Sequence, residues 1–527
     1  MFSINAKKEW FALLFPKSMH KQYQDFVLSF INTSYIEMNM LNPVLRYAKH
    51  IVAFFISDLT RLYDLIRHAY TNSPCGAKPK DPVALFRSLI LMTYCKFTSI
   101  DAWVQELRTN NILAILSGFL PWDYKPTGNE PYLPDTIPGV GTFYDFMDRL
   151  VLVDRLFHKS HYKRPRKNKK RPKLKKGEKL NNTRPGVIDR LCKRVVNMGD
   201  RKLPDTMESR LNSILKEIFV LPSIEMGIMG DPLKFNVAGD STNIITAANP
   251  FGKRICDCGS KGIKQCGCIR YYSDPHADWG WDSTDECYFY GHVFHHFTAS
   301  DSPYDLPIII KPVSARRFDG VTGVFALKEL VDLYPELKFY SASFDKAYDA
   351  MGFYRLLTHF RIAPIIDINE RSAKGLPLPE GFDNDGYFIC PAGYRMMKDG
   401  VDWSRRRHKN RCPHAISPDK YPCDRACSPN PSGRTIYNYL DDNPRAFCPI
   451  PRNSDLWKTL YNKRPSTERC NDRIKNDFAV KHAGVRSIQR WTVRFFLGAF
   501  CMYIDTWHKN CDLKITDLFP VLKDIPA

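Results

Sequence analysis

Apolar residues recur at helical spacing through the first part of the chain, up to about residue 155. Residues 50–70, 82–95, 100–107, 111–120 and 142–156 each show this period. Asp81 precedes the second of these segments as an N-cap residue, and Pro82 takes the first helical position. Residues 121–138 are rich in proline and glycine and predict a loop. The pattern predicts an all-α N-terminal domain over residues 1–157.

From residue 233 onward the pattern predicts short strands with helices between them. Strands are expected at 233–238, 288–298, 306–312, 337–344 and 362–368, and helices at 187–198, 205–219, 321–334 and 350–360. Three strands followed by helix, strand, helix and strand is the order of elements in an α/β ribonuclease-H-like core, a mixed sheet flanked by helices. A final helix over 487–505 is apolar around most of its circumference and is expected to be buried.

Two segments depart from these patterns. Residues 163–179 contain eleven Lys or Arg against one acidic residue, Glu178, and two prolines discourage a helix. We expect a disordered basic linker over 158–186, which either contacts a phosphate backbone or is a solvated spacer. Residues 371–455 are crowded with Gly, Pro, Asp and Cys and predict an insertion. This insertion separates the first part of the ribonuclease-H-like core (187–370) from its last part (456–527), which contains a helix over 465–478 and the C-terminal helix.

The charge balance narrows the functional classes. The net charge is +21, from 77 Lys and Arg against 56 Asp and Glu. A globular protein this basic usually binds nucleic acid or an anionic membrane. Apolar runs such as 495–504 are shorter than the roughly 20 residues of a membrane span, and the run at 10–15 is too short for a signal peptide. We expect a cytoplasmic, nucleoid-associated protein whose sixteen cysteines are reduced thiols or metal ligands.

Three carboxylates stand where this order of elements can bring them together. Asp240 follows the first predicted strand, Asp345 follows the fourth, and Glu468 lies on a predicted helix over 465–478. A single aspartate after a strand is usually a turn or cap residue, so the prediction rests on all three. Carboxylates suit Mg²⁺ (or Mn²⁺), and two such ions about 4 Å apart suit in-line phosphoryl transfer. Phosphodiester cleavage or exchange is the chemistry expected of this set.

The stretch at 461–475 reads Y-N-K-R-P-S-T-E-R-C-N-D-R-I-K. On a regular helix, one stripe roughly 60° wide would carry a phenol, a guanidinium, a carboxylate and an ammonium: Tyr461, Arg464, Glu468 and Lys475. Pro465 cannot donate to the carbonyl of Tyr461, so the regular helix is expected to begin near Pro465. Asp472, one turn beyond Glu468, is a rival for the carboxylate role. An amphipathic helix with a solvated charged face is the alternative.

These residues carry a family resemblance. The spacing Tyr461-x2-Arg464-x3-Glu468-x6-Lys475 matches in full the Tyr-Arg-Glu-Lys motif of bacterial insertion-sequence DDE transposases. G-D-S-T at 239–242 and F-D-K-A-Y-D at 344–349 resemble the family's first and second acidic motifs. The segments 272–281 and 142–150 are also similar to the family, so that the resemblance runs from about residue 80 to residue 505.

The resemblance implies a role for each motif residue. Asp240, Asp345 and Glu468 would be the catalytic, metal-binding triad, with two Mg²⁺ (or Mn²⁺) ions. Tyr461, Arg464 and Lys475 would hold transposon-end DNA, and Asp472 would be an exposed helix residue.

The expected protein is thus a DNA transposase that hydrolyses element ends and joins the freed 3′ hydroxyl to target DNA. It would act on double-stranded DNA as a homodimer or a higher oligomer. Additional DNA contacts are expected from the basic segment: Lys163, Arg164, Arg166, Lys167, Lys169, Lys170 and Arg171. A structure-selective DNA nuclease on the same fold and a non-catalytic DNA-binding protein derived from a transposase are the alternatives.

The cysteines suggest two structural zinc sites, with reduced surface thiols as the alternative. Cys256-x-Cys258 and Cys266-x-Cys268 are two close pairs, although zinc sites more often have two to four residues within a pair. The second candidate set lies in the insertion, where a metal would replace a missing core, with Cys390 and Cys448 as extra thiols. Its members are Cys412, His414, Cys423 and Cys427.

Other acidic and histidine residues of this region are not expected to be catalytic. Asp274, Asp278 and Asp282 are expected to be loop acids beside a hairpin. His295 and His296 alternate along a strand and are expected to be packed or exposed.

Overall fold

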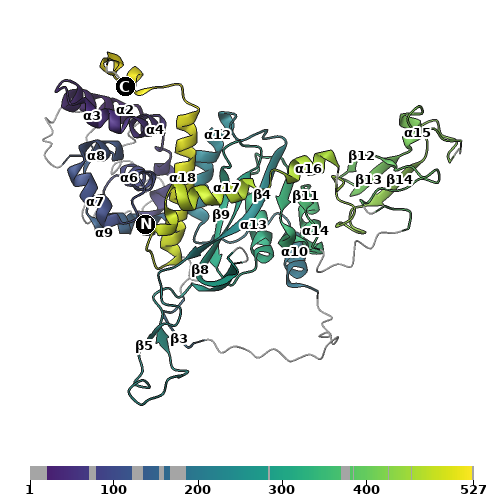
Figure 1. Ribbon diagram of the computed structural model, residues 1–527, viewed down its shortest axis with the longest axis horizontal. Helices are drawn as coiled ribbons and strands as arrows, with labels where there is room; N and C mark the ends of the chain where they lie inside the picture. The colour runs from purple at the N-terminus through teal and green to yellow at the C-terminus, as the bar shows by residue number, and fades with distance from the viewer. Residues whose placement is uncertain are drawn as a thin grey trace, which may run out of the picture.

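The computed structural model describes residues 20–70, 79–121, 134–152, 159–165, 185–282, 285–369, 380–383, 385–424, 427–452 and 454–524. These residues form a mixed α/β protein with an N-terminal helical region, a six-stranded mixed sheet and two three-stranded sheets (Figure 1). No helix in this part of the chain combines the length and the apolar character that crossing a bilayer requires.

The N-terminal region is helical, as predicted. Its helices are α2 (His20–Ile31), η1 (Asn32–Ile36), α3 (Leu41–Arg46), α4 (Ala48–Ile56), α5 (Leu62–Ile66), η2 (Arg67–Ala69), α6 (Pro82–Tyr94), α7 (Ile100–Thr109), α8 (Asn111–Ser117) and α9 (Val140–Leu150). Asp81 caps α6 by accepting a hydrogen bond from the backbone N–H of Val83, with Pro82 at the first helical position. The single helix expected over 50–70 is two helices, because the chain turns extended at Ser57. Two short parallel strands, β1 (Phe119–Leu120) and β2 (Asp135–Thr136), adjoin this region.

The central sheet contains the five predicted strands and one more. Its strands are β4 (Phe235–Ile245), β7 (Asp278–Asp282), β8 (Cys287–Ala299), β9 (Pro307–Ser314), β10 (Phe339–Phe344) and β11 (Ala363–Ile366). The strand order is β11-β10-β4-β8-β7, and β9 also pairs with β8. β10 is parallel to both β4 and β11, whereas β8 is antiparallel to its neighbours. Helices α13 (Asp319–Leu333) and α14 (Met351–His359) follow β9 and β10, with the short η5 (Lys346–Tyr348) between β10 and α14.

Two expectations about this sheet are corrected. Asp278 and Asp282 are not loop acids, because they begin and end β7, an edge strand whose Trp279 and Trp281 are exposed. Asp240 does not end its strand either. The antiparallel partner β8 pairs with β4 as far as Ile245, which keeps the backbone extended beyond Asp240. The site residue therefore lies within a strand.

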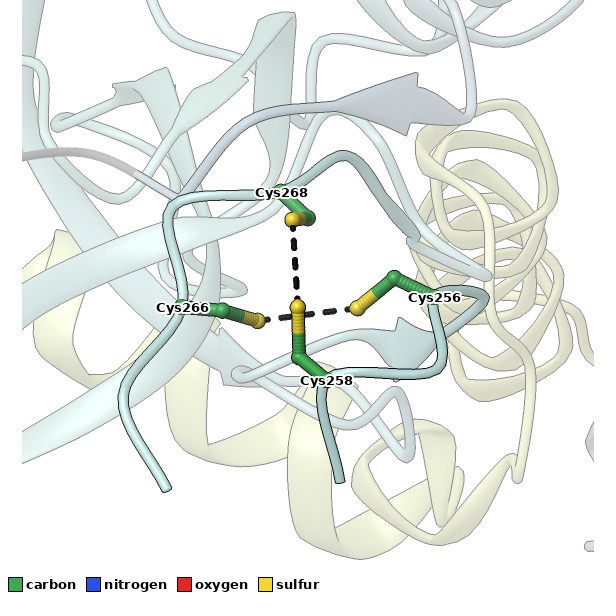
Figure 2. Close-up of side chains that lie close together, drawn as sticks. All are labelled: Cys256, Cys258, Cys266 and Cys268. Carbon is green, nitrogen blue, oxygen red and sulfur yellow. Dashed lines mark hydrogen bonds between the residues drawn. The ribbon is translucent and has the colours of Figure 1, made fainter. Parts of the chain in front are cut away.

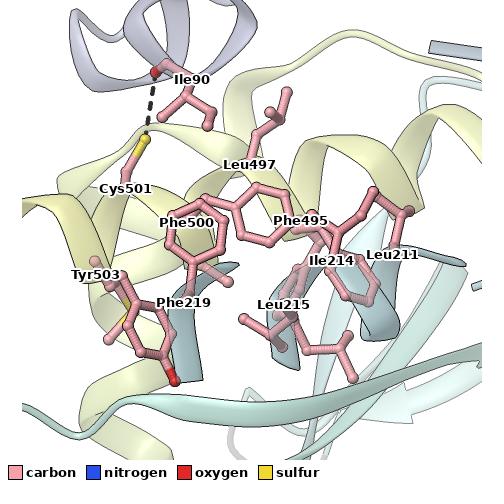
Figure 3. Packing of buried hydrophobic residues seen from close by; sticks show 14 of the residues in the cluster. Ile90, Leu211, Ile214, Leu215, Phe219, Phe495, Leu497, Phe500, Cys501 and Tyr503 are labelled. Atoms are coloured by element: carbon pink, nitrogen blue, oxygen red, sulfur yellow. Dashed lines mark hydrogen bonds between the residues drawn. The ribbon is translucent and has the colours of Figure 1, made fainter. Parts of the chain in front are cut away.

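One buried helix joins the N-terminal region to the sheet. α18 (Ile488–Lys509) is buried from residue 491 to residue 507, as its apolar circumference predicts. Phe500 stacks on Phe219 with ring centroids 4.5 Å apart (Figure 3). Phe495 stacks on Phe294 at 4.4 Å. Each fully buried side chain of this kind contributes about 1.5–3 kcal/mol. The N-terminal helices, α18 and the sheet consequently share one continuous core.

The helices that precede the sheet pack on this core and on the sheet. They are α10 (Val187–Met198), α11 (Ser209–Ile214), η4 (Leu215–Val220) and α12 (Leu221–Glu225).

The insertion is ordered where it is described. It contains an antiparallel sheet of β12 (Met397–Asp402), β13 (Arg407–Arg411) and β14 (Thr435–Tyr439), with the short helix α15 (Pro413–Ile416). Its inward positions are polar: His408 donates to the carbonyl of Cys448 at 2.7 Å, and Asn410 donates to Asn438 at 2.6 Å. Because these buried residues are polar, the sequence shows no apolar period there.

The chain then returns to the core in short helices. These are α16 (Asp455–Tyr461), α17 (Ser466–Asp472), η6 (Arg473–Asp477) and η7 (Val480–His482), and after α18 come α19 (Ile515–Leu518) and η8 (Pro520–Asp524). A small sheet of β3 (Tyr162–Lys163), β5 (Lys253–Arg254) and β6 (Arg270–Tyr271) stands away from the central sheet as an arm (Figure 1).

Candidate functional site

Asp240 and Asp345 lie side by side on neighbouring strands. β4 and β10 are parallel, and Ala238 is the register partner of Ser343. Each aspartate is two residues beyond its strand's member of that pair. The two residues therefore stand at matching positions where β10 ends and β4 continues, and the Asp345 carboxylate acts on the pKa of Asp240. The Asp345 side chain accepts a hydrogen bond from the backbone N–H of Ala347 at 2.9 Å, which fixes its direction.

A third acidic side chain, Asp319, is a neighbour that sequence reasoning missed. It is the first residue of α13, and Ser241 Oγ donates to its Oδ1 at 2.6 Å. The pKa of Asp319 is raised by burial and by the Asp345 carboxylate, while the Ser241 hydrogen bond opposes the rise. An acid at a helix start is normally a cap residue, so only the contact with the strand shows that it belongs to this cluster.

The cluster disfavours negative charge on Asp240. Burial is the main cause that raises the pKa of this carboxyl to about 7, against the opposing hydrogen bond from the N–H of Ser241. The carboxylates of Asp345 and Asp319 add to the rise, and the Arg464 guanidinium counters it. Burial, with a contribution from Glu468, also raises the pKa of Asp345. Several half-buried carboxylates that repel one another form a donor set that a divalent cation would stabilise.

Glu468 is carried toward these aspartates by α17, which packs against β4 and β8. Pro465 is the N-cap residue of α17, so the regular helix begins where the proline predicted. Ser466 hydrogen-bonds Thr298 of β8 at 2.8 Å, and Cys470 is fully buried on the core side of the helix. Glu468 is on the outer side, with about half of its side chain exposed (54 %).

Arg464 faces both the helix and the strands. It lies in the turn between α16 and α17, and its Nη2 donates to Glu468 at 2.7 Å. Its positive charge also lowers the pKa of Asp240 and of Asp345. A guanidinium here neutralises part of the carboxylate cluster, and Glu468 is paired with Arg464 rather than directed solely at the two aspartates.

Lys475 reaches the same strand from the other end of the helix. It lies in η6, a π-helical turn, and its Nζ donates to Asn243 Oδ1 at 3.0 Å. Asn243 is three residues beyond Asp240 on β4, roughly 10 Å along the strand. Burial lowers the pKa of Lys475, and Asp282 opposes that shift. The wider π-helical turn changes the helical register between Glu468 and Lys475. Contrary to the prediction from the sequence, the two residues therefore do not share one face of a regular helix; α17, which carries Glu468, packs on β4, and Lys475 bonds to Asn243 of the same strand.

The two remaining residues of the 461–475 stretch have different surroundings. Tyr461 is half-buried, and its ring stacks on Trp457 with centroids 4.8 Å apart. Asp472 is exposed and accepts a hydrogen bond from Asn476 one turn later. Asp472 is thus placed as a solvent-facing helix residue, away from the carboxylate cluster.

The basic segment is described only at its start. Lys163 is not part of a linker: it lies in β3, donates to the carbonyl of Pro275 at 3.0 Å and covers the ring of Tyr272. Arg164 follows it and is exposed. The other predicted phosphate contacts, Arg166, Lys167, Lys169, Lys170 and Arg171, lie outside the described residues.

Four cysteines form a cluster that can hold a structural metal such as zinc. The sulfur atoms of Cys256, Cys258, Cys266 and Cys268 all lie within 4.8 Å of one another (Figure 2). In the described part of the chain, no other group of three or more His, Cys, Asp or Glu side chains has its ligand atoms this close together. The carboxylates of the predicted triad are spaced more widely than these sulfurs.

The residues of the second predicted zinc set lie together in the insertion. Cys412, Cys423 and Cys427 line one small cavity of the insertion together with His414, and Cys390 joins them. His414 Nδ1 donates to the carbonyl of Tyr421 at 2.9 Å. The structure therefore adds Cys390 to the predicted set.

Asp274 and His295, which were not expected to be catalytic, are buried in the fold. Asp274, expected in a loop, is fully buried; it accepts hydrogen bonds from His292 at 2.7 Å and from the backbone N–H groups of His276 and Ala277. His295 is also fully buried, and burial lowers its pKa to about 3, so it is neutral at physiological pH.

Comparison of the chain with models of known protein families, with curated proteins and with solved structures gave no match. The resemblance to DDE transposases therefore rests on this chain's own motif residues.

Proposed function

We propose that this protein is a DNA transposase of the DDE type. The observation that carries the proposal is the side-by-side placement of Asp240 and Asp345 on parallel strands, with Glu468 on a helix packed over the same strand. The strand order β9-β8-β4-β10-β11, with β8 antiparallel, supports a ribonuclease-H-like core. The matched Tyr-Arg-Glu-Lys spacing favours a transposase over other metal-dependent nucleases, a distinction that the three carboxylates alone would not make.

The donor chemistry fits divalent metal binding. Asp240, Asp345 and Glu468 would hold Mg²⁺ or Mn²⁺, and Asp319 adds negative potential close by. When bound, the ions supply Lewis-acid activation of the attacking oxygen and stabilisation of the leaving 3′ oxygen. Arg464 neutralises Glu468 and lies within the electrostatic reach of both aspartates, so it would hold the carboxylates in place and attract a scissile phosphate.

The proposed substrate is double-stranded DNA. The net charge of +21 provides a general attraction to phosphate, and Lys475, which donates to Asn243 of the strand that also carries Asp240, would add a local positive charge. The enzyme would act on element ends and target DNA as a homodimer or a higher oligomer. The basic residues beyond Lys163 would add contacts to the phosphate backbone.

The test is an assay on the DNA that flanks the gene. Purified protein is incubated with a fragment carrying the terminal inverted repeats, with Mg²⁺ or with a chelator. A transposase releases 3′ ends at the repeats and joins them to a plasmid only when Mg²⁺ is present. Cleavage that depends on DNA structure and gives no joined product would favour the nuclease, and binding without cleavage would favour a DNA-binding protein. Absence of binding at low salt would overturn all three.

We predict separate roles for Lys475 and Glu468. Lys475→Ala should weaken binding to end DNA by about tenfold, the effect of losing one charge-assisted contact, and should make the slope of log affinity against log salt shallower by about one. Glu468→Gln should leave affinity intact and eliminate turnover. Fluorescence anisotropy and single-turnover cleavage measure the two effects. Lys458→Ala, an exposed lysine on α16, is the matched control and should change neither. An unaltered salt slope in Lys475→Ala would contradict the phosphate contact.

A further inference from the structure

The arm formed by β5 and β6 ends in a loop that has no hydrophobic core. The strands are two residues each, and residues 255–269 connect them. Between residues 253 and 269, every side chain except those of the four cysteines is exposed. Ile255, Ile263 and Ile269 are 53 %, 47 % and 44 % exposed. Ordering such a loop costs roughly 1–2 kcal/mol per residue of backbone entropy, and apolar burial does not offset that cost here.

Small elements without a core are usually held by a disulfide or a metal. The cysteines are the shielded residues of this loop, so the stabilising interaction must involve them. Their Sγ atoms meet crosswise: Cys256 is 3.6 Å from Cys266, and Cys258 is 3.6 Å from Cys268. Figure 2 shows the four sulfurs directed toward one another from two sides of the loop. Two separate disulfides would isolate one pair from the other, whereas here all four sulfurs surround one point.

The separations match tetrahedral zinc. A Zn–S bond of about 2.3 Å in a regular tetrahedron places any two sulfurs about 3.8 Å apart. The two shortest separations are 3.6 Å, and all of them are within 4.8 Å. The single residue within each Cys-x-Cys pair does not prevent this arrangement. Cys256 lies at a bend and Cys258 in the turn that follows it, whereas residues 266–268 have no regular structure. Both pairs still bring their sulfurs to the same centre.

We propose that Cys256, Cys258, Cys266 and Cys268 bind one structural Zn²⁺ that holds the tip of this arm. Four thiolates fill a tetrahedral site and leave no position for water, which is typical of structural and not catalytic zinc. The thiolate set selects zinc over Mg²⁺, so this site is distinct from the carboxylate cluster. The loop and its two strands are basic: residues 253–270 hold one acidic residue, Asp257, against five cations, Lys253, Arg254, Lys261, Lys264 and Arg270.

Metal analysis of the full-length protein tests the proposal directly. Zinc content is measured by mass spectrometry for the wild type, for Cys258→Ala/Cys266→Ala, and for Cys287→Ala as a control with an exposed thiol. The double variant should contain one zinc per chain less than the wild type, and the control should equal the wild type. The result is the zinc content of the wild type minus that of the double variant, so zinc bound elsewhere in the chain cancels. Equal zinc in the double variant and the control, or iron in place of zinc, would overturn the proposal.

Proteolysis of the wild-type chain provides a second measurement that needs no variant. Arg254, Lys261 and Lys264 are exposed trypsin sites in or next to the loop. Chelation should expose them to cutting within residues 254–264, and added Zn²⁺, but not added Mg²⁺, should restore protection. Mass spectrometry of the fragments locates the cuts. Cutting that is unchanged by chelation would mean that the loop is held without metal. Both readouts are independent of any activity on DNA.

Discussion

Alanine at Asp240, Asp345 or Glu468 is expected to lower Mg²⁺-dependent cleavage of end DNA by about 10³- to 10⁴-fold, the scale seen when one member of a catalytic unit is removed. Affinity for DNA should change little, because each substitution removes a proposed metal ligand and not a proposed phosphate contact. Single-turnover cleavage and equilibrium binding, measured on the same preparations, check both halves of the prediction.

The buried aspartate should show a second effect with the opposite sign. The folded-state pKa of Asp240, about 7, lies above the ordinary value of an aspartate, so its charged form destabilises the fold as pH rises through this range. Asp240→Asn should therefore melt higher than the wild type in metal-free buffer at about pH 8. The difference should shrink as pH falls and vanish below about pH 3, where the carboxyl is protonated in both the folded and the unfolded state. Loss of activity together with a gain in stability is the signature of a functional carboxylate cluster.

Asp472→Ala is the control on the same helix. Asp472 is exposed and bonds to Asn476, so its removal should leave cleavage and binding unchanged. If Glu468→Ala cleaved normally and Asp472→Ala did not, the assignment of the third carboxylate would be wrong. A similar drop in melting temperature in Glu468→Ala and Asp472→Ala would instead favour an amphipathic helix whose charged face is only solvated.

Lys311→Met is expected to lower the free energy of unfolding by about 3–5 kcal/mol, the cost of breaking a buried ion pair by removing one partner. Lys311 lies on β9, and its Nζ donates to Glu208 at 2.8 Å and to Glu329 at 2.6 Å. Burial opposes its charge, but the two carboxylates prevail and raise the pKa of Lys311. Methionine keeps most of the volume and leaves two buried carboxylates without their cation.

The pH dependence distinguishes this effect from a packing defect. Burial raises the pKa of Glu329 even with Lys311 present. Without the lysine, protonation of the carboxylates relieves their repulsion, so the loss should be largest above about pH 7 and should shrink toward about pH 5. Chemical denaturation at several pH values measures it. Lys409→Met, which breaks an exposed pair with Asp399, is the control and should cost less than about 1 kcal/mol. A loss in Lys311→Met that is the same at every pH would indicate packing alone.

Local patterns in the sequence predicted much of the fold. Asp81 and Pro82 mark the start of α6 because capping and a fixed proline φ act within a few residues. Pro465 marks the start of α17 for the same reason. The five core strands and the buried C-terminal helix follow from apolar periodicity. The Tyr-Arg-Glu-Lys spacing, with Asp240 and Asp345 next to apolar runs that predict strands, indicated which residues form the candidate site.

The tertiary structure alone decided the rest, because the deciding contacts join residues far apart in the chain. Asp319 reads as a helix cap until its hydrogen bond with Ser241 places it in the carboxylate cluster. β13 has no apolar period, because polar residues such as His408 fill its buried positions and bond across the insertion.

The cysteine loop shows the same limit of local patterns. A one-residue gap within each pair is unusual for zinc on sequence grounds, and only the folding of the loop, with a bend and turn at residues 256–258 opposite residues 266–268, brings four sulfurs to one centre. Sequence determined which side chains were present and which local structures they favoured. The pairing of β4 with β8 and β10, and the turn of the loop between β5 and β6, determined which of these side chains come together.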